Sequence, residues 1–166
     1  MLVVENLTKN IDNIPVLDGA SLTIEDGSIY GLVGKNGAGK TTIIRHLAGV
    51  LRQDSGSIRY DDEDIWENAE LRQRIGLIPD EIYFPPGYSL RNMRKMYSRI
   101  YHNWNPERYQ ELLERFGLPE KKNLRTFSKG QKKQAAFCLV MSIMPDYLLL
   151  DEPLDGLDPI MRKTIW

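Results

Sequence analysis

The sequence predicts an α/β fold, because strand-like and helix-like segments share a chain of 166 residues, a length typical of one domain. Three observations support this prediction: short apolar runs rich in β-branched residues, apolar residues repeated at helical spacing, and a glycine-rich loop between a strand and a helix. The expected strands are residues 2–4, 22–24, 29–33, 75–78 and 147–150.

Composition and charge exclude several classes of protein. An apolar fraction of 42% and a charged fraction of 27% are those of a globular domain, and a net charge of −1 provides no basic field for a nucleic-acid partner. Met1–Glu5 contains no basic leader, and the apolar run Ala135–Met144 is too short to cross a bilayer. The lone cysteine, Cys138, lies in that run and is expected to be a buried thiol. We therefore expect a cytoplasmic protein that reaches a membrane only through a partner.

In the first half of the chain, turn sequences separate the expected strands. Asp18-Gly19 and Asp26-Gly27 have the composition of turns. A helix is expected over Lys40–Leu47, with Gly49 closing it. The acidic run Asp61–Asp64 invites a metal-site interpretation, but it lacks the alternating ligands and the glycine of a calcium loop. A solvated turn is therefore favoured there.

The second half is predicted to be mainly helical. The run Pro85–Gly87 marks a break, where a hinge could lie. A helix is expected between Asn105, a capping residue followed by proline, and Gly117. Ser128 and Gln131 have the spacing of a capping box, which predicts the start of another helix.

The loop of residues 34–41 has the pattern G-x-x-x-x-G-K-T and lies between an expected strand and an expected helix. Gly34, Gly37 and Gly39 allow phosphate oxygens to approach the backbone N–H groups closely. The positive end of the following helix favours the same anion. Lys40 can contact the β- and γ-phosphates, and the Thr41 hydroxyl can bind Mg²⁺. The loop therefore predicts a site for a nucleoside triphosphate.

Two carboxylates follow the last expected strand, Tyr147–Leu150. Asp151 and Glu152 would lie at its carboxyl end, the edge at which open α/β sheets bind ligands. Asp151 is expected to hold Mg²⁺ through its water shell, and Glu152 to accept a proton from an attacking water. Alone, the pattern fits a plain strand end followed by a turn as well as it fits a functional pair of carboxylates. The phosphate loop favours the functional interpretation.

Two further segments show which kind of phosphate-loop protein this sequence resembles. Phe127–Gln131 reads Phe-Ser-Lys-Gly-Gln and resembles the Leu-Ser-Gly-Gly-Gln signature of ATP-binding cassette (ABC) proteins. Leu154–Pro159 is similar to the D-loop of that family. With the phosphate loop and the Asp-Glu pair, the chain resembles the nucleotide-binding subunit of a bacterial ABC transporter from Met1 to Trp166.

The resemblance implies a P-loop NTPase core of ABC type, with an N-terminal antiparallel β portion and a helical insertion. Residues 1–82 and 134–166 would form the ATP-binding core, and residues 83–133 a helical subdomain that includes the signature. Because the family's domain is longer, the chain is expected to be incomplete at its C-terminus and to lack the switch histidine. Hydrolysis by these residues alone is then expected to be slow or absent.

The resemblance also implies a mechanism, in which two such domains pair head to tail with ATP and Mg²⁺ between them and dimerisation powers a transmembrane permease. The second subunit could be identical or different, and the permease would dock near residues 83–101 at the inner face of the cell membrane.

The resemblance also implies which residues form the site. The expected nucleotide-binding residues are Gly34, Asn36, Gly37, Gly39, Lys40, Thr41, Thr42, Ser128, Gly130 and Gln131. The expected metal ligands are Thr41 and Asp151, and the expected catalytic residue is Glu152.

The chain departs from the family pattern at three places. Asp80 and Glu81 lie where the family has the glutamine of its Q-loop. Lys129 replaces the first glycine of the signature, and Ile11 lies near the position of the aromatic residue that stacks on adenine. These departures are similar to those of a subgroup of bacterial exporters.

Six basic residues surround the signature, and two interpretations of them stay open. They form a solvated helix face, or they attract the nucleotide bound to the partner subunit. The six are Lys121, Lys122, Arg125, Lys129, Lys132 and Lys133.

Two other functions compete with the transport subunit. A soluble ABC-type ATPase acting on ribosomes or DNA would usually carry tandem cassettes or a long coiled coil, and neither is visible. A small-molecule kinase would use the same phosphate loop, but would need an acceptor pocket in place of the signature and the D-loop.

Overall fold

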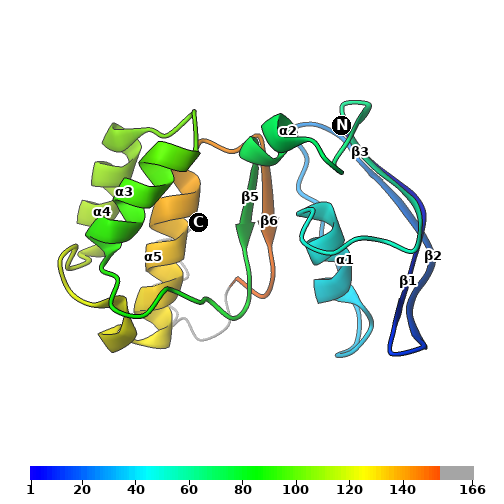
Figure 1. Cartoon of the computed structure of the whole chain (residues 1–166), viewed down its shortest axis with the longest axis horizontal. Helices are drawn as coiled ribbons and strands as arrows, with labels where there is room; N and C mark the ends of the chain where they lie inside the picture. Colours follow the sequence, from blue (N-terminus) through cyan, green and yellow to red (C-terminus); the bar gives the residue numbers. More distant parts are fainter. Residues whose placement is uncertain (154–166) are drawn as a thin grey trace. The chain divides into compact units, whose positions relative to one another are not determined.

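A computed structural model describes residues 1–153, which form an α/β fold, as predicted (Figure 1). The chain divides into two compact units, residues 1–72 and residues 73–166. The expected D-loop, Leu154–Pro159, lies outside the described residues. Within residues 1–153, every helix is too short or too polar to cross a membrane.

The first unit contains a four-stranded antiparallel sheet with the strand order β2-β1-β3-β4. Its strands are β1 (Leu2–Ile11), β2 (Ile14–Ile24), β3 (Ser55–Tyr60) and β4 (Glu63–Asp64). Two-residue turns with positive φ close both hairpins, Asp12-Asn13 with φ 52° and 62° and Asp61-Asp62 with φ 50° and 67°. The N-terminal antiparallel portion and the turn in the acidic run are therefore confirmed.

Asp18-Gly19 does not form the expected turn but lies inside β2. Between the pairs Leu7↔Ala20 and Lys9↔Leu17, β2 contains one residue more than β1. Gly19 has φ 68°, so its left-handed conformation accommodates a bulge in a continuous strand. Asp26-Gly27 does form a turn, as expected.

The expected strand at residues 29–33 is wrong for this structure. The segment has no regular secondary structure, and Ile29 and Val33 are 90% and 97% exposed. A strand exists only where a neighbour accepts its ladder of hydrogen bonds, and none of the strands β1–β4 pairs with this segment.

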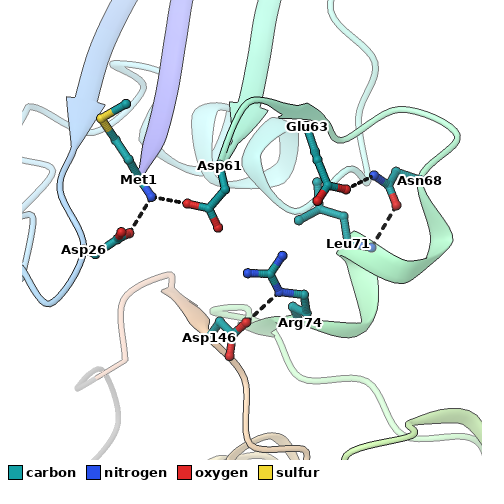
Figure 2. A network of polar contacts seen from close by, with 8 residues as sticks. All are labelled: Met1, Asp26, Asp61, Glu63, Asn68, Leu71, Arg74 and Asp146. Atoms are coloured by element: carbon teal, nitrogen blue, oxygen red, sulfur yellow. Dashed lines mark hydrogen bonds and ion pairs between the residues drawn. The ribbon is translucent and has the colours of Figure 1, made fainter.

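Helices α1 (Lys40–Leu47) and α2 (Ala69–Gln73) accompany the sheet. Asn68 precedes α2; its Oδ1 accepts from the Leu71 N–H at 2.9 Å, and its amide donates to Glu63 at 2.8 Å (Figure 2). The terminal ammonium of Met1 donates to the carboxylates of Asp26 and Asp61 (Figure 2). Buried side chains from β1, β3, these helices and the segment after β4 form the core, among them Leu7, Leu47, Ile58, Tyr60, Ile65 and Leu71.

The second unit contains a parallel pair of strands, β5 (Ile75–Ile78) and β6 (Tyr147–Leu150), both as predicted. Arg74 and Asp146, which precede the two strands, form an ion pair of 2.6 Å (Figure 2). Gly76 allows a helix to pack closely on β5, since an added Cβ would lie 2.7 Å from Val140 Cγ1. These contacts fix the register of β5 and β6. The register in turn sets the position of the two carboxylates that follow β6.

The helices of this unit lie beside one another (Figure 1). They are α3 (Leu90–Ile100), α4 (Pro106–Phe116), a 3₁₀ turn (Leu124–Thr126) and α5 (Lys129–Met141). The caps predicted for α4 are confirmed, because Asn105 accepts from the Arg108 N–H at 2.8 Å and Gly117 has φ 61°. The helical core consists of buried Leu90, Met93, Tyr109, Leu112, Leu113, Leu118, Leu124, Phe127, Ala135, Cys138 and Leu139.

Cys138 is fully buried in this core, as expected. Its thiol donates to the Tyr109 carbonyl at 3.6 Å, and burial raises the pKa of the thiol to about 12. A thiol with so high a pKa is not a nucleophile at neutral pH.

Candidate functional site

The phosphate loop folds around the side chain of Lys40. The ammonium donates to the carbonyls of Gly34 at 2.7 Å and Lys35 at 3.0 Å, and the Ala38 N–H donates back to the Lys35 carbonyl at 3.1 Å. The lysine thus holds the beginning of the loop against the start of α1. The positive charge is positioned where the loop would receive an anion.

Two glycines of the loop have a left-handed backbone, Gly37 with φ 80° and Gly39 with φ 86°. A Cβ at Gly39 would lie 3.0 Å from both the Val16 carbonyl and a methyl of Leu17, so this position requires glycine for space as well as for φ. A Cβ at Gly37 would meet nothing within 4 Å. The backbone at Gly37 therefore borders open space from which a ligand can approach.

The N-terminus of α1 is not neutralised by the side chains of its own helix. Gly39 is its N-cap residue and supplies no side-chain cap, and the first turn contains no acidic residue. Asn36 in the loop is exposed, whereas Thr41 and Thr42 in the first turn are half-buried. An uncapped N-terminus with a neighbouring ammonium favours a bound anion.

Sequence reasoning assigned no role to His46, which lies in α1 and is fully buried. Its Nδ1 lies 2.7 Å from the Thr42 carbonyl, so Nδ1 carries the proton and donates to this acceptor. Nε2 is buried and has no hydrogen-bond partner. Burial lowers the pKa of the imidazole, an effect that the Thr42 carbonyl partly opposes.

We expect His46 to make stability depend on pH. Because the folded-state pKa lies below the unfolded value of about 6.5, the unfolded chain binds the proton more readily, and stability present above that value is lost as the pH falls. His46→Asn keeps a donor for the Thr42 carbonyl and removes the titration. Urea unfolding between about pH 7.5 and pH 5 should show a smaller loss of stability in this variant than in the wild type.

His102→Asn is the matched control, because His102 is the only other histidine of the sequence and is exposed. The pH dependence of unfolding should be reduced more by His46→Asn than by His102→Asn. An equal slope in His46→Asn and the wild type would contradict the assignment.

In the second unit, two carboxylates follow β6. The Asp151 N–H donates to the Ile78 carbonyl at 3.0 Å, which extends the parallel pairing by one residue. Asp151 is buried, whereas Glu152 is exposed and has a left-handed backbone with φ 47°. Left-handed backbone is uncommon for residues other than glycine and occurs often at functional sites. The Asp-Glu pair is thus at the carboxyl end of the strand, where it was expected.

The signature segment begins α5 with a complete capping box. Ser128 Oγ accepts from the Gln131 N–H at 3.2 Å, and the Gln131 side chain accepts from the Ser128 N–H at 3.1 Å. The structural prediction for this motif is therefore confirmed. A hydroxyl whose oxygen accepts one hydrogen bond still carries a proton that it can donate to an anion. Lys129 is exposed beside it, and Gly130 is buried.

Of the two interpretations of the basic cluster, the solvated face is wrong for Lys133. This residue is 1% exposed, whereas Lys121, Lys122, Arg125 and Lys129 are exposed. Its ammonium donates to the Glu152 carbonyl and lies 3.6 Å from Asp80 Oδ1. A helical pattern could have revealed this, because Lys133 precedes the buried residues Ala136, Phe137 and Val140 at i+3, i+4 and i+7.

Each unit thus assembles part of the predicted site. The first unit brings together Gly34, Asn36, Gly37, Gly39, Lys40, Thr41 and Thr42, and the second contains Asp151, Glu152, Ser128, Gly130 and Gln131. Within residues 1–153, no group of three or more histidine, cysteine or acidic side chains forms a metal cluster. Ile11, expected near adenine, is half exposed at the end of β1.

This chain is similar to known proteins of one family. The family model for ABC transporters matches residues 17–155. The chain is 37% identical over 165 residues to the ABC transporter ATP-binding protein YtrB of Bacillus subtilis, covering 99% of this chain and 56% of that protein. It is 33% identical over 171 residues to the daunorubicin resistance ATP-binding protein DrrA3 of Streptomyces coeruleorubidus, covering 99% and 54%.

A solved ATP-binding subunit of an ABC transporter superimposes with a TM-score of 0.89 at 24% identity, covering 99% of this chain and 71% of that chain. This likeness confirms the fold class. The chain spans about half the length of the curated relatives named above.

Proposed function

The chain belongs to the ABC transporter family, and on this basis we propose that it is the ATP-binding, ATP-hydrolysing part of a transporter subunit. The observation that carries the proposal is the phosphate loop, where the Lys40 ammonium and the uncapped N-terminus of α1 meet. Backbone N–H groups, a dipole and a fixed cation are what a polyphosphate requires. Asn36, Thr41 and Thr42 complete this side of the site.

Mg²⁺ is the proposed companion of the nucleotide. The Thr41 hydroxyl and the buried Asp151 carboxylate would hold it, and both offer the oxygen donors that this ion prefers. When bound, the ion neutralises charge on the phosphates.

Glu152 is the proposed general base. Its carboxylate is exposed, so it can accept a proton from a water molecule that attacks the γ-phosphate. Ser128, Gly130 and Gln131 begin α5, and this helix N-terminus would contact the γ-phosphate bound to a second subunit. ATP would then join two subunits, and its hydrolysis would release them.

The partner that uses this cycle is proposed to be a transmembrane permease. The relative DrrA3 is named for daunorubicin resistance, which favours export of a small molecule. Residues 83–133 are the proposed helical subdomain, with docking near residues 83–101, where Tyr83 is 78% exposed. The subunit would then act at the cytoplasmic face of the membrane.

Co-purification tests this partner against a soluble ABC-type ATPase that acts on ribosomes or DNA. The tagged full-length protein should be recovered with multi-span membrane chains after detergent extraction. Recovery with ribosomal RNA or DNA, and with no membrane protein, would contradict the transport function and favour the alternative.

A further inference from the structure

Lys133 is an unusual lysine, because its whole side chain is buried in the second unit. It lies in the second turn of α5, five residues after Ser128, on the face that also carries Phe137 and Val140. A buried ammonium loses its hydration and persists only where partners replace water. Its partners therefore indicate what the residue does.

The first partner is the carbonyl of Glu152, which accepts a hydrogen bond from the Lys133 ammonium. The backbone of Glu152 is left-handed, with φ 47°, a conformation that persists in a residue with a Cβ only where its surroundings impose it. The hydrogen bond from Lys133 supplies such a constraint. It acts on the main chain, so the carboxylate of Glu152 stays exposed.

The second partner is Asp80, which follows β5 at the position where the resemblance predicts a glutamine. Its Oδ1 lies 3.6 Å from the Lys133 ammonium, is buried and has no hydrogen bond. A carboxylate can accept but not donate, whereas a glutamine amide does both. Lys133 balances the charge that the acidic side chain brings.

We propose that Lys133 is a positioning residue of the hydrolytic site, which fixes the backbone of Glu152 and neutralises Asp80 from within α5. It joins the signature helix, the segment after β5 and the turn after β6 through one side chain. Its effect on ATP turnover rests on the proposed function. The two contacts themselves lie within one unit and can be tested without nucleotide.

The test compares Lys133→Met, Asp80→Asn and the double variant in ATP turnover by the full-length protein. Lys133→Met should lower kcat by between about tenfold and a hundredfold, with KM for ATP within about twofold, because the orientation of Glu152 and the charge balance at Asp80 change while the phosphate loop keeps its own residues. Asp80→Asn added to Lys133→Met should recover part of kcat, because it removes the unpaired carboxylate. Arg115→Met, which removes an exposed positive charge on α4, should leave kcat unchanged.

Equal kcat in Lys133→Met and the wild type, or fully additive effects of the two substitutions, would overturn the proposal. A wild type without turnover would instead contradict the proposed function.

A second measurement covers the case in which Lys133→Met fails to fold. In nitrogen-15 spectra of the wild type, the Lys133 ammonium should exchange with water more slowly than exposed lysines, and Asp80→Asn should shift its signal. Rapid exchange of this ammonium would overturn the proposal whatever the turnover.

Discussion

Lys40→Ala is expected to reduce ATP binding below detection by calorimetry. The substitution removes the charge-assisted hydrogen bonds proposed between Lys40 and the phosphates, each worth about 1.5–3 kcal/mol. It also removes the two contacts that hold the loop, to the carbonyls of Gly34 and Lys35. A combined loss of about 3 kcal/mol weakens affinity more than a hundredfold.

Lys35→Ala is the matched control for this experiment. Lys35 lies in the same loop and is exposed, and its carbonyl, which accepts from Lys40, is retained in alanine. This variant should bind ATP within a few-fold of the wild type, while circular dichroism confirms that both variants are folded. Tight ATP binding by Lys40→Ala would contradict the assignment of the loop.

Local signals predicted the parts of this protein that depend on local chemistry. The boundaries of α4 follow from Asn105 and Gly117, and the start of α5 follows from the pairing of Ser128 with Gln131. In each case the capping partner lies within a few residues along the chain. The glycine pattern of the phosphate loop is local in the same sense, because φ at Gly37 and Gly39 is set by a short turn.

Features that depend on distant neighbours were predicted less well. Residues 29–33 have the composition of a buried strand, but a strand also needs a partner, which composition does not specify. Gly19 signals positive φ correctly, yet a turn and a bulge use the same conformation, and only the pairing of β2 with β1 distinguishes them. The sequence shows that residues 29–33 favour a strand and that Gly19 favours a positive φ. Which structure each segment forms depends on its pairing with other strands.

Lys133 shows the same limit at the candidate site. A lysine among six basic residues suggests a solvated surface, whereas its burial depends on Asp80 and Glu152, which are 53 and 19 residues away along the chain. The phosphate loop and the Asp-Glu pair were found because each is contiguous. The residue that connects the Asp-Glu pair to α5 was not found, since no short motif contains it.

Glu152→Gln is expected to retain ATP binding and to trap an ATP-bound dimer of the full-length protein. Glutamine has the size of glutamate but cannot accept the proton of the attacking water, which should lower kcat by about 10²–10⁴-fold. The backbone carbonyl that accepts from Lys133 is unchanged, so the turn after β6 is preserved. Without hydrolysis, the γ-phosphate would remain bound to both subunits.

Light scattering after gel filtration with ATP and Mg²⁺ measures this outcome directly. The mass of Glu152→Gln should double when ATP is present, whereas the wild type should return to its starting mass as ATP is consumed. Glu107→Gln, an exposed glutamate in the first turn of α4, should behave as the wild type. Because Lys40→Ala is expected to prevent nucleotide binding at the proposed interface, adding it to Glu152→Gln should abolish the dimer. A dimer that persists in the double variant would mean that contacts other than ATP join the subunits.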